Sequence, residues 1–255
     1  KEWTPVKRMG RNEDLPRPGT DLIPKPGSRE LDDLCRERAV IGNGYIRCYL
    51  LIPVLGREVQ DVQLLVWHIM KNGGPGEFFT SALRRWMRNR FLERNRHRVK
   101  HFDAETFDVA VHVRRGDVTD PMRWIEQSVY AAVVRRICIE RTIQNKRRGN
   151  EKDRRRRTAV HIFSSGVNRD GNWTALESVT DVCSGGVHLH LDEYEFDTWS
   201  HFVAADAFVM SKSSFSYVPA LLSEGEIHFP FGFLHLRLPH WRRFRDTDGS
   251  EVPLK

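Results

Sequence analysis

Two groups of charged and hydroxyl side chains follow apolar segments and have the chemistry to bind an anion. The first is His-Val-Arg-Arg-Gly-Asp at residues 112–117, directly after the apolar run Val109-Ala110-Val111. A guanidinium offers a rigid fork of donors that matches phosphate, so two adjacent arginines suit a diphosphate. An exposed ion-pair cluster at a strand end would also explain these residues, and the six residues alone leave both interpretations open.

The second group is a serine-rich segment after another apolar run. Residues 206–210 read as an acidic start followed by a buried strand, and Ser-Lys-Ser-Ser-Phe-Ser follows at residues 211–216. Residues 217–222 are typical of a helix. Hydroxyl groups and free backbone N–H groups at a helix N-terminus form an anion site. Simple N-capping explains one serine better than three.

The elements that must position both groups alternate between strand and helix from residue 105 onward. Apolar runs predict strands at residues 109–113, 159–164, 187–191, 206–210 and 226–229, the last one short. Helices are predicted between them at about residues 125–142, 173–182, 197–204 and 217–222. This alternation predicts a parallel, doubly wound α/β sheet of the Rossmann type. Ligands of such sheets bind just outside the carboxyl ends of the strands, where both groups lie.

The chain before residue 105 has a different character. Residues 1–29 are rich in proline and glycine and lack an apolar period, which predicts an extended segment. Residues 30–104 read as mostly helical, with helices at 59–70 and 78–91, and we interpret them as part of an N-terminal or interdomain region. Residues 105–245 form the predicted Rossmann-like domain and residues 246–255 a tail.

Composition limits the partners. The 255 residues include 41 lysines and arginines against 34 acids, a net charge of +7 that suits nucleic acid, a membrane surface or a nucleotide. The basic stretch 144–157 lacks interleaved aromatic residues, which favours a solvated loop over a nucleic-acid patch. The sequence has no run of 18 apolar residues, the length that would predict a membrane span. The four cysteines have no metal spacing and permit a disulfide without requiring one.

Three histidines have the spacing of metal ligands. His188 and His190 alternate along a predicted strand, and His161 lies on the strand before it. A half-exposed strand explains them better, so no metal is predicted. Trp241 is expected to close the core.

Together the two groups resemble the fucosyltransferase superfamily, which covers the α1,2-, α1,6- and protein O-fucosyltransferases of the GT-B fold. Residues 112–117 look like their His-x-Arg-Arg-Gly-Asp motif, and residues 205–217 look like their last motif, in the same order and spacing. The likeness is strong over about residues 105–235 and weak before them. It implies the nucleotide-binding C-terminal half of a GT-B enzyme. The implied reaction is inverting, metal-independent transfer of fucose from GDP-fucose to a hydroxyl of a glycan or protein.

The resemblance implies roles for the first motif. Arg114 matches the arginine that holds the β-phosphate of GDP-fucose and stabilises GDP as it leaves. Arg115 matches its neighbour, which braces the motif within reach of phosphate, and His112 matches a residue near the nucleotide.

The resemblance also assigns the second motif. Ser213 and Ser214 match a pair that contacts phosphate. Asp197 matches, within a one-residue gap, a carboxylate that accepts from the guanine N1–H and amino group.

The general base stays open at this point. Some relatives have an acid a few residues past the motif, where this sequence has Met122. Asp117 and Asp120 are the nearest candidates for a catalytic carboxylate. Asp117 is better explained as a structural residue that holds Arg114 and Arg115.

Two other classes of function remain. A relative that has lost its base would bind a nucleotide or carbohydrate without catalysis, and the net charge alone would fit a nucleic-acid-binding protein. A glycosyltransferase with a membrane anchor upstream of Lys1 would lie in the Golgi or another secretory compartment; the cytoplasm is the alternative.

Overall fold

The structure is a computed structural model that describes residues 81–116, 120–147, 157–165, 173–233, 235 and 237–253. The chain divides into two compact units, residues 1–91 and 92–255, whereas the sequence suggested a boundary between 104 and 105. The predicted extended segment and the helix at 59–70 lie outside the described residues. Helix α5 is Ser81–Asn95, four residues longer at its end than the predicted helix at 78–91.

The second unit is built on a seven-stranded sheet. Its strands are β1 Thr106–His112, β2 Arg157–Ser164, β3 Val187–Leu191, β4 Ala207–Val209, β5 Glu226–Pro230, β6 Arg242–Phe244 and β7 Glu251–Val252. Their order is β3-β2-β1-β4-β5-β6-β7, and every neighbouring pair is parallel except β6 with β7. The predicted parallel α/β sheet is therefore confirmed.

Two parts of the sequence prediction are wrong at the C-terminal end of this sheet. The strand at 226–229 is not the last one, because β6 and β7 follow it. Residues 246–255 are not only a tail, since β7 pairs with β6 within them. Trp241, directly before β6, is fully buried against Phe229 and Tyr217, which confirms its place in the core.

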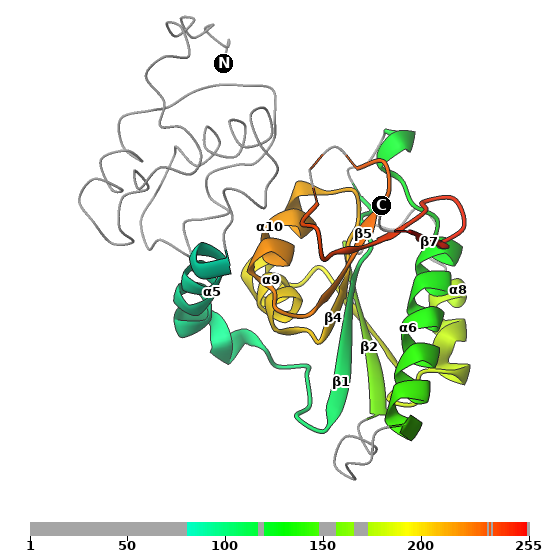
Figure 1. The fold of residues 1–255 in the computed structure, drawn as a ribbon, viewed down its shortest axis with the longest axis horizontal. Helices are drawn as coiled ribbons and strands as arrows, with labels where there is room; N and C mark the ends of the chain where they lie inside the picture. The colour runs from blue at the N-terminus through cyan, green and yellow to red at the C-terminus, as the bar shows by residue number, and fades with distance from the viewer. Residues whose placement is uncertain are drawn as a thin grey trace, which may run out of the picture. The chain divides into compact units, whose positions relative to one another are not determined.

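Helices cover both faces of the sheet (Figure 1). Helix α6, Gln127–Arg147, and the short helix α8, Thr174–Glu177, lie on one face, and α9, Glu195–Ala204, and α10, Ser214–Leu222, lie on the other. Because side chains alternate along a strand, Val109 and Val111 of β1 enter the core beneath α6, while His112 contacts Phe202 of α9.

The strand order reverses between β1 and β4. The chain runs from β1 outward to β2 and β3, and α9 then carries it back so that β4 pairs with the other side of β1, with Val109 opposite Ala207. Ligands of open α/β sheets bind at such a topological switch point, just outside the carboxyl ends of the strands. Both candidate groups follow these two strands.

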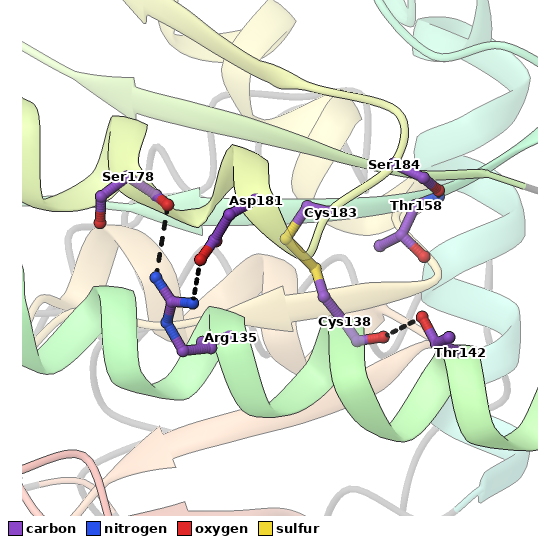
Figure 2. The surroundings of a disulfide bond; sticks show 8 residues. All are labelled: Arg135, Cys138, Thr142, Thr158, Ser178, Asp181, Cys183 and Ser184. Carbon is purple, nitrogen blue, oxygen red and sulfur yellow. Dashed lines mark hydrogen bonds and ion pairs between the residues drawn. A yellow bond between two sulfur atoms is a disulfide. The ribbon is translucent and has the colours of Figure 1, made fainter.

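A disulfide joins Cys138 of α6 to Cys183, which follows the 3-10 turn Ser178–Asp181 (Figure 2). One turn earlier, Arg135 of α6 pairs with Asp181 at 2.7 Å and donates to the Ser178 carbonyl. These contacts fasten α6 to the segment that leads into β3.

The basic stretch 144–157 is not simply a loop. Helix α6 continues to Arg147, and the positive charges of Lys146 and Arg147 in its last turn interact favourably with the negative end of the helix dipole. Strand β2 begins at Arg157. Residues 148–156 lie outside the described residues. Within the part of the chain that the structure describes, no helix has the length and apolar character to cross a bilayer.

Candidate functional site

Arg114 and Ser213 meet across the switch point. The Nη1 atom of Arg114 donates a hydrogen bond of 2.7 Å to the Oγ atom of Ser213, which joins the loops after β1 and β4. Ser213 is the N-cap of α10, since its Oγ also accepts from the backbone N–H of Phe215. A guanidinium therefore lies beside the positive end of a helix, an arrangement that stabilises an anion.

The guanidinium of Arg115 contacts the loop that follows β1. Arg115 is 4% exposed, and its guanidinium donates to the carbonyls of Arg114 and Ile125 at 2.9 and 3.0 Å. The same group stacks 3.8 Å from the ring centre of Trp124. Arg115 thus holds the loop after β1 in shape and leaves Arg114 as the arginine of the pair that meets Ser213.

His112 connects β1 to α10. Its Nδ1 atom hydrogen-bonds with the hydroxyls of Ser211 and Ser216, and its ring packs against Phe202 and Phe215. Burial, and secondarily the charge of Arg114, lowers the pKa of His112 to about 3. The neutral imidazole is thus fixed within the protein. Ser211 and Ser216 received no role from the sequence, although they belong to the same serine-rich segment.

Ser214 contacts a histidine that the sequence analysis did not single out. Its Oγ lies 3.0 Å from the Nε2 atom of His235, whose ring stacks on Tyr217. Burial, followed by the charge of Arg123, lowers the pKa of His235 to about 4. Ser214 is partly exposed, so its hydroxyl lies next to a neutral imidazole at the first turn of α10.

We expect acid to destabilise the protein through these two histidines. An unfolded histidine binds a proton below about pH 6.5, whereas folded His112 and His235 bind one only near pH 3 and 4. Their contribution to the free energy of unfolding is complete above pH 6.5. It decreases as the pH falls toward 4, by about 1.4 kcal/mol per pH unit for each histidine. Melting temperatures between pH 7 and 4.5 measure the slope. A His112→Gln variant with the same slope as the parent would contradict the assignment to His112.

Gly116 gives the motif its turn. Its φ of +80° lies in the left-handed region, and a Cβ atom there would lie 2.7 Å from the Oγ atom of Ser165. The neighbouring Ser164 hydroxyl donates to the carbonyl of Val113 at 2.7 Å. The loop after β1 is therefore held closely against the end of β2, which limits position 116 to glycine.

Of the two candidate bases, the structure describes Asp120. Asp117 lies outside the described residues. Asp120 is exposed, and its Oδ1 accepts from the backbone N–H of Met122, so that it caps the 3-10 turn Pro121–Arg123. The side chain of Met122 is 77% exposed on this turn.

Asp197 lies in the first turn of α9, which follows β3 at the carboxyl edge of the sheet. Its carboxylate accepts from Arg98 at 2.7 Å and from Lys100 at 3.2 Å. Desolvation opposes its ionisation, but the hydrogen bonds from Arg98 and Lys100 outweigh this effect and lower the pKa of Asp197. Sequence reasoning missed both partners, because they come from the irregular segment before β1.

The histidines at the strand positions are not isolated. His190 of β3 stacks on His101 and lies 3.1 Å from His161 of β2, and His101 stacks in turn on His201 of α9. The interpretation of β3 as a half-exposed strand describes its exposure but misses this cluster. Within the described residues, His101, His190 and Glu193 are the group able to hold a metal ion.

Comparison of the chain with protein-family models and with curated proteins finds no match. The contact between Arg114 and Ser213 at the switch point is therefore the basis on which a function is assigned.

Proposed function

We propose that the chain is a glycosyltransferase that transfers fucose from GDP-fucose to a hydroxyl of a glycan or glycoprotein. In this proposal the sheet is the nucleotide-binding half of a GT-B-type enzyme. The contact between Arg114 and the N-cap Ser213 carries the argument, because it combines a guanidinium, a hydroxyl and a helix N-terminus at the edge where parallel sheets bind ligands.

The proposed reaction is an inverting displacement. The acceptor hydroxyl attacks the anomeric carbon from the face opposite GDP, the bond from that carbon to the β-phosphate oxygen breaks, and GDP leaves with the bonding electrons. Negative charge grows on the phosphate as the bond breaks, so a fixed guanidinium stabilises the transition state more than the bound donor. Arg114 supplies that charge without a metal ion, and Asp117 or Asp120 takes the acceptor proton.

The proposal assigns base recognition to Asp197. A guanine edge presents two donors, N1–H and the amino group, and a carboxylate offers two acceptors. The place of Asp197 in the first turn of α9, at the carboxyl edge of the sheet, supports this role. Arg98 and Lys100 already bind this carboxylate, so guanine would have to share or replace these contacts.

One observation favours a second candidate, a relative that binds the donor nucleotide without catalysis. The turn after the motif carries exposed Met122 where some fucosyltransferases have an acid, and the Asp120 carboxylate caps that turn. Hydrolysis or transfer from GDP-fucose would distinguish the enzyme from this alternative.

The disulfide supports a secretory location for the proposed enzyme. Disulfides such as Cys138–Cys183 persist in oxidising compartments and are rare in the cytosol. The Golgi or another secretory compartment is therefore the proposed location.

Nucleotide choice tests the proposal. We expect GDP to raise the melting temperature more than UDP or ADP, because only guanine offers two adjacent donors to Asp197. In an Asp197→Asn variant the three shifts should become similar, while binding of the shared diphosphate persists. Equal shifts for all three nucleotides in the parent would contradict the guanine assignment and leave a general diphosphate site.

A further inference from the structure

Two imidazoles converge on the carboxylate of Glu193, which lies between β3 and α9. The Nε2 atom of His101 lies 2.7 Å from Glu193 Oε1, and the Nδ1 atom of His190 lies 3.4 Å from the same oxygen. The three potential ligand atoms all lie within 4.8 Å of one another. The second carboxylate oxygen of Glu193, Oε2, is buried and has no hydrogen-bond partner among the described residues.

We propose that His101, His190 and Glu193 form a binding site for a divalent transition-metal ion of the zinc class. Two imidazoles and one carboxylate are a ligand set that zinc accepts, and they leave a fourth position for water. The buried Glu193 Oε2 is the observation that favours a cation, because a carboxylate oxygen removed from water needs a partner. This inference does not rest on the proposed function.

A chain of buried groups orients the imidazole of His190. Its Nε2 lies 3.1 Å from Nδ1 of His161. The Nε2 atom of His161 lies 3.4 Å from Oδ1 of Asp108 without a hydrogen bond between them, and this Oδ1 accepts from Thr106. When His190 carries its proton on Nε2, it donates to Nδ1 of His161, and the lone pair on its Nδ1 then faces Glu193. Outer partners of this kind, ending in a carboxylate, fix the orientation of metal-binding histidines.

His101 is held by its backbone, while its ring is less constrained. The backbone N–H groups of Lys100 and His101 both donate to Nε2 of His201, which donates through Nδ1 to the carbonyl of Asp197. The rings of His101 and His190 stack with their centres 4.1 Å apart and their planes 23° apart.

A metal ion must lie near the plane of each imidazole that binds it, so one of the two stacked rings has to turn. His190 is packed on its other side by Phe163, whereas the side chain of His101 is 31% exposed on an irregular segment. We therefore expect the ring of His101 to turn on binding. The ion would then join the segment before β1 to the loop before α9. The same segment carries Arg98 and Lys100, the partners of Asp197.

Metal titration of the untagged 255-residue protein tests the site. We expect saturable binding of Zn²⁺ by calorimetry, and a visible absorption spectrum of four-coordinate Co²⁺ that Zn²⁺ displaces. Glu193→Gln and His101→Gln should each weaken Zn²⁺ binding at least tenfold, since loss of even an outer partner costs about 10- to 100-fold. Both residues are partly exposed, and an unchanged melting temperature without metal would establish that the variants fold.

His188→Gln is the matched control. His188 lies on β3 like His190 and stacks on His161, but it is not one of the three ligands. Its replacement should therefore change the affinity for Zn²⁺ by no more than about twofold. Three outcomes would overturn the proposal: no saturable Zn²⁺ binding up to millimolar concentration, unchanged affinity in both ligand variants, or an equal loss in the control. The second would mean that the ion binds elsewhere on the chain, and the third that exposed histidines bind it without a site.

Discussion

Replacing Arg114 with alanine is expected to remove nearly all fucose transfer while the protein remains folded. Loss of a charge-assisted contact to phosphate should weaken GDP binding by about 1.5–3 kcal/mol. The rate of transfer should fall further, because charge on the leaving phosphate increases in the transition state. Calorimetry with GDP and turnover of GDP-fucose measure the two effects. If Arg114→Ala binds GDP like the parent, the nucleotide site is not at the switch point.

Arg115→Ala is the matched control for this variant. It removes a buried guanidinium, two hydrogen bonds to backbone carbonyls and the stack on Trp124, so its main effect should be on folding. The free energy of unfolding should fall by about 2–3 kcal/mol, because the two carbonyls lose a charged donor. A greater fall in melting temperature for Arg115→Ala than for Arg114→Ala is the expected order, and the reverse order would contradict the division of roles between the two arginines.

Loss of the disulfide between Cys138 and Cys183 should have the largest effect on stability. The bond closes a loop with a sequence separation of 45 residues (Figure 2), and a cross-link of that span restricts the unfolded chain by about 4 kcal/mol in the loop-entropy model. Denaturant unfolding of a Cys138→Ala/Cys183→Ala double variant, compared with the oxidised parent, measures this difference.

Reduction provides a second measurement of the same bond. Dithiothreitol should destabilise the parent as much as the double substitution does, and should not destabilise the double variant further. A Cys35→Ser/Cys48→Ser variant controls for the other two cysteines and should keep the sensitivity of the parent. A parent whose stability is unaffected by dithiothreitol would show that this disulfide does not form.

The strands that the sequence predicted are those whose own residues form an apolar run. The apolar runs of β1, β2 and β3 are buried or half-buried in any parallel sheet, and their positions came within a few residues. Strands β6 and β7 lack such a run, and they pair with β5 and with each other. Arg242 of β6 pairs with Glu140, Glu226 and Glu251 from three other elements, an arrangement that no local pattern reveals.

The candidate site divides in the same way. The order of strands and loops was enough to bring Arg114 and Ser213 to one edge, whereas Arg115 is held in the loop after β1 by the carbonyls of Arg114 and Ile125. The partners of Asp197 and the histidine cluster could not be predicted. Each of these combines residues from separate strands, helices and irregular segments, and their proximity arises only when the whole sheet is assembled.

The pairing of β1 with β4 has a consequence for synthesis of the chain. Arg114 and Ser213 are separated by 99 residues, which a ribosome takes about 5–20 s to add. During that interval β1 pairs at most with β2, and its other side presents unsatisfied backbone N–H and C=O groups. A strand that is buried along its whole length in the finished protein is therefore an open edge while the chain is being made. At this stage pairing with another nascent copy competes directly with completion of the fold.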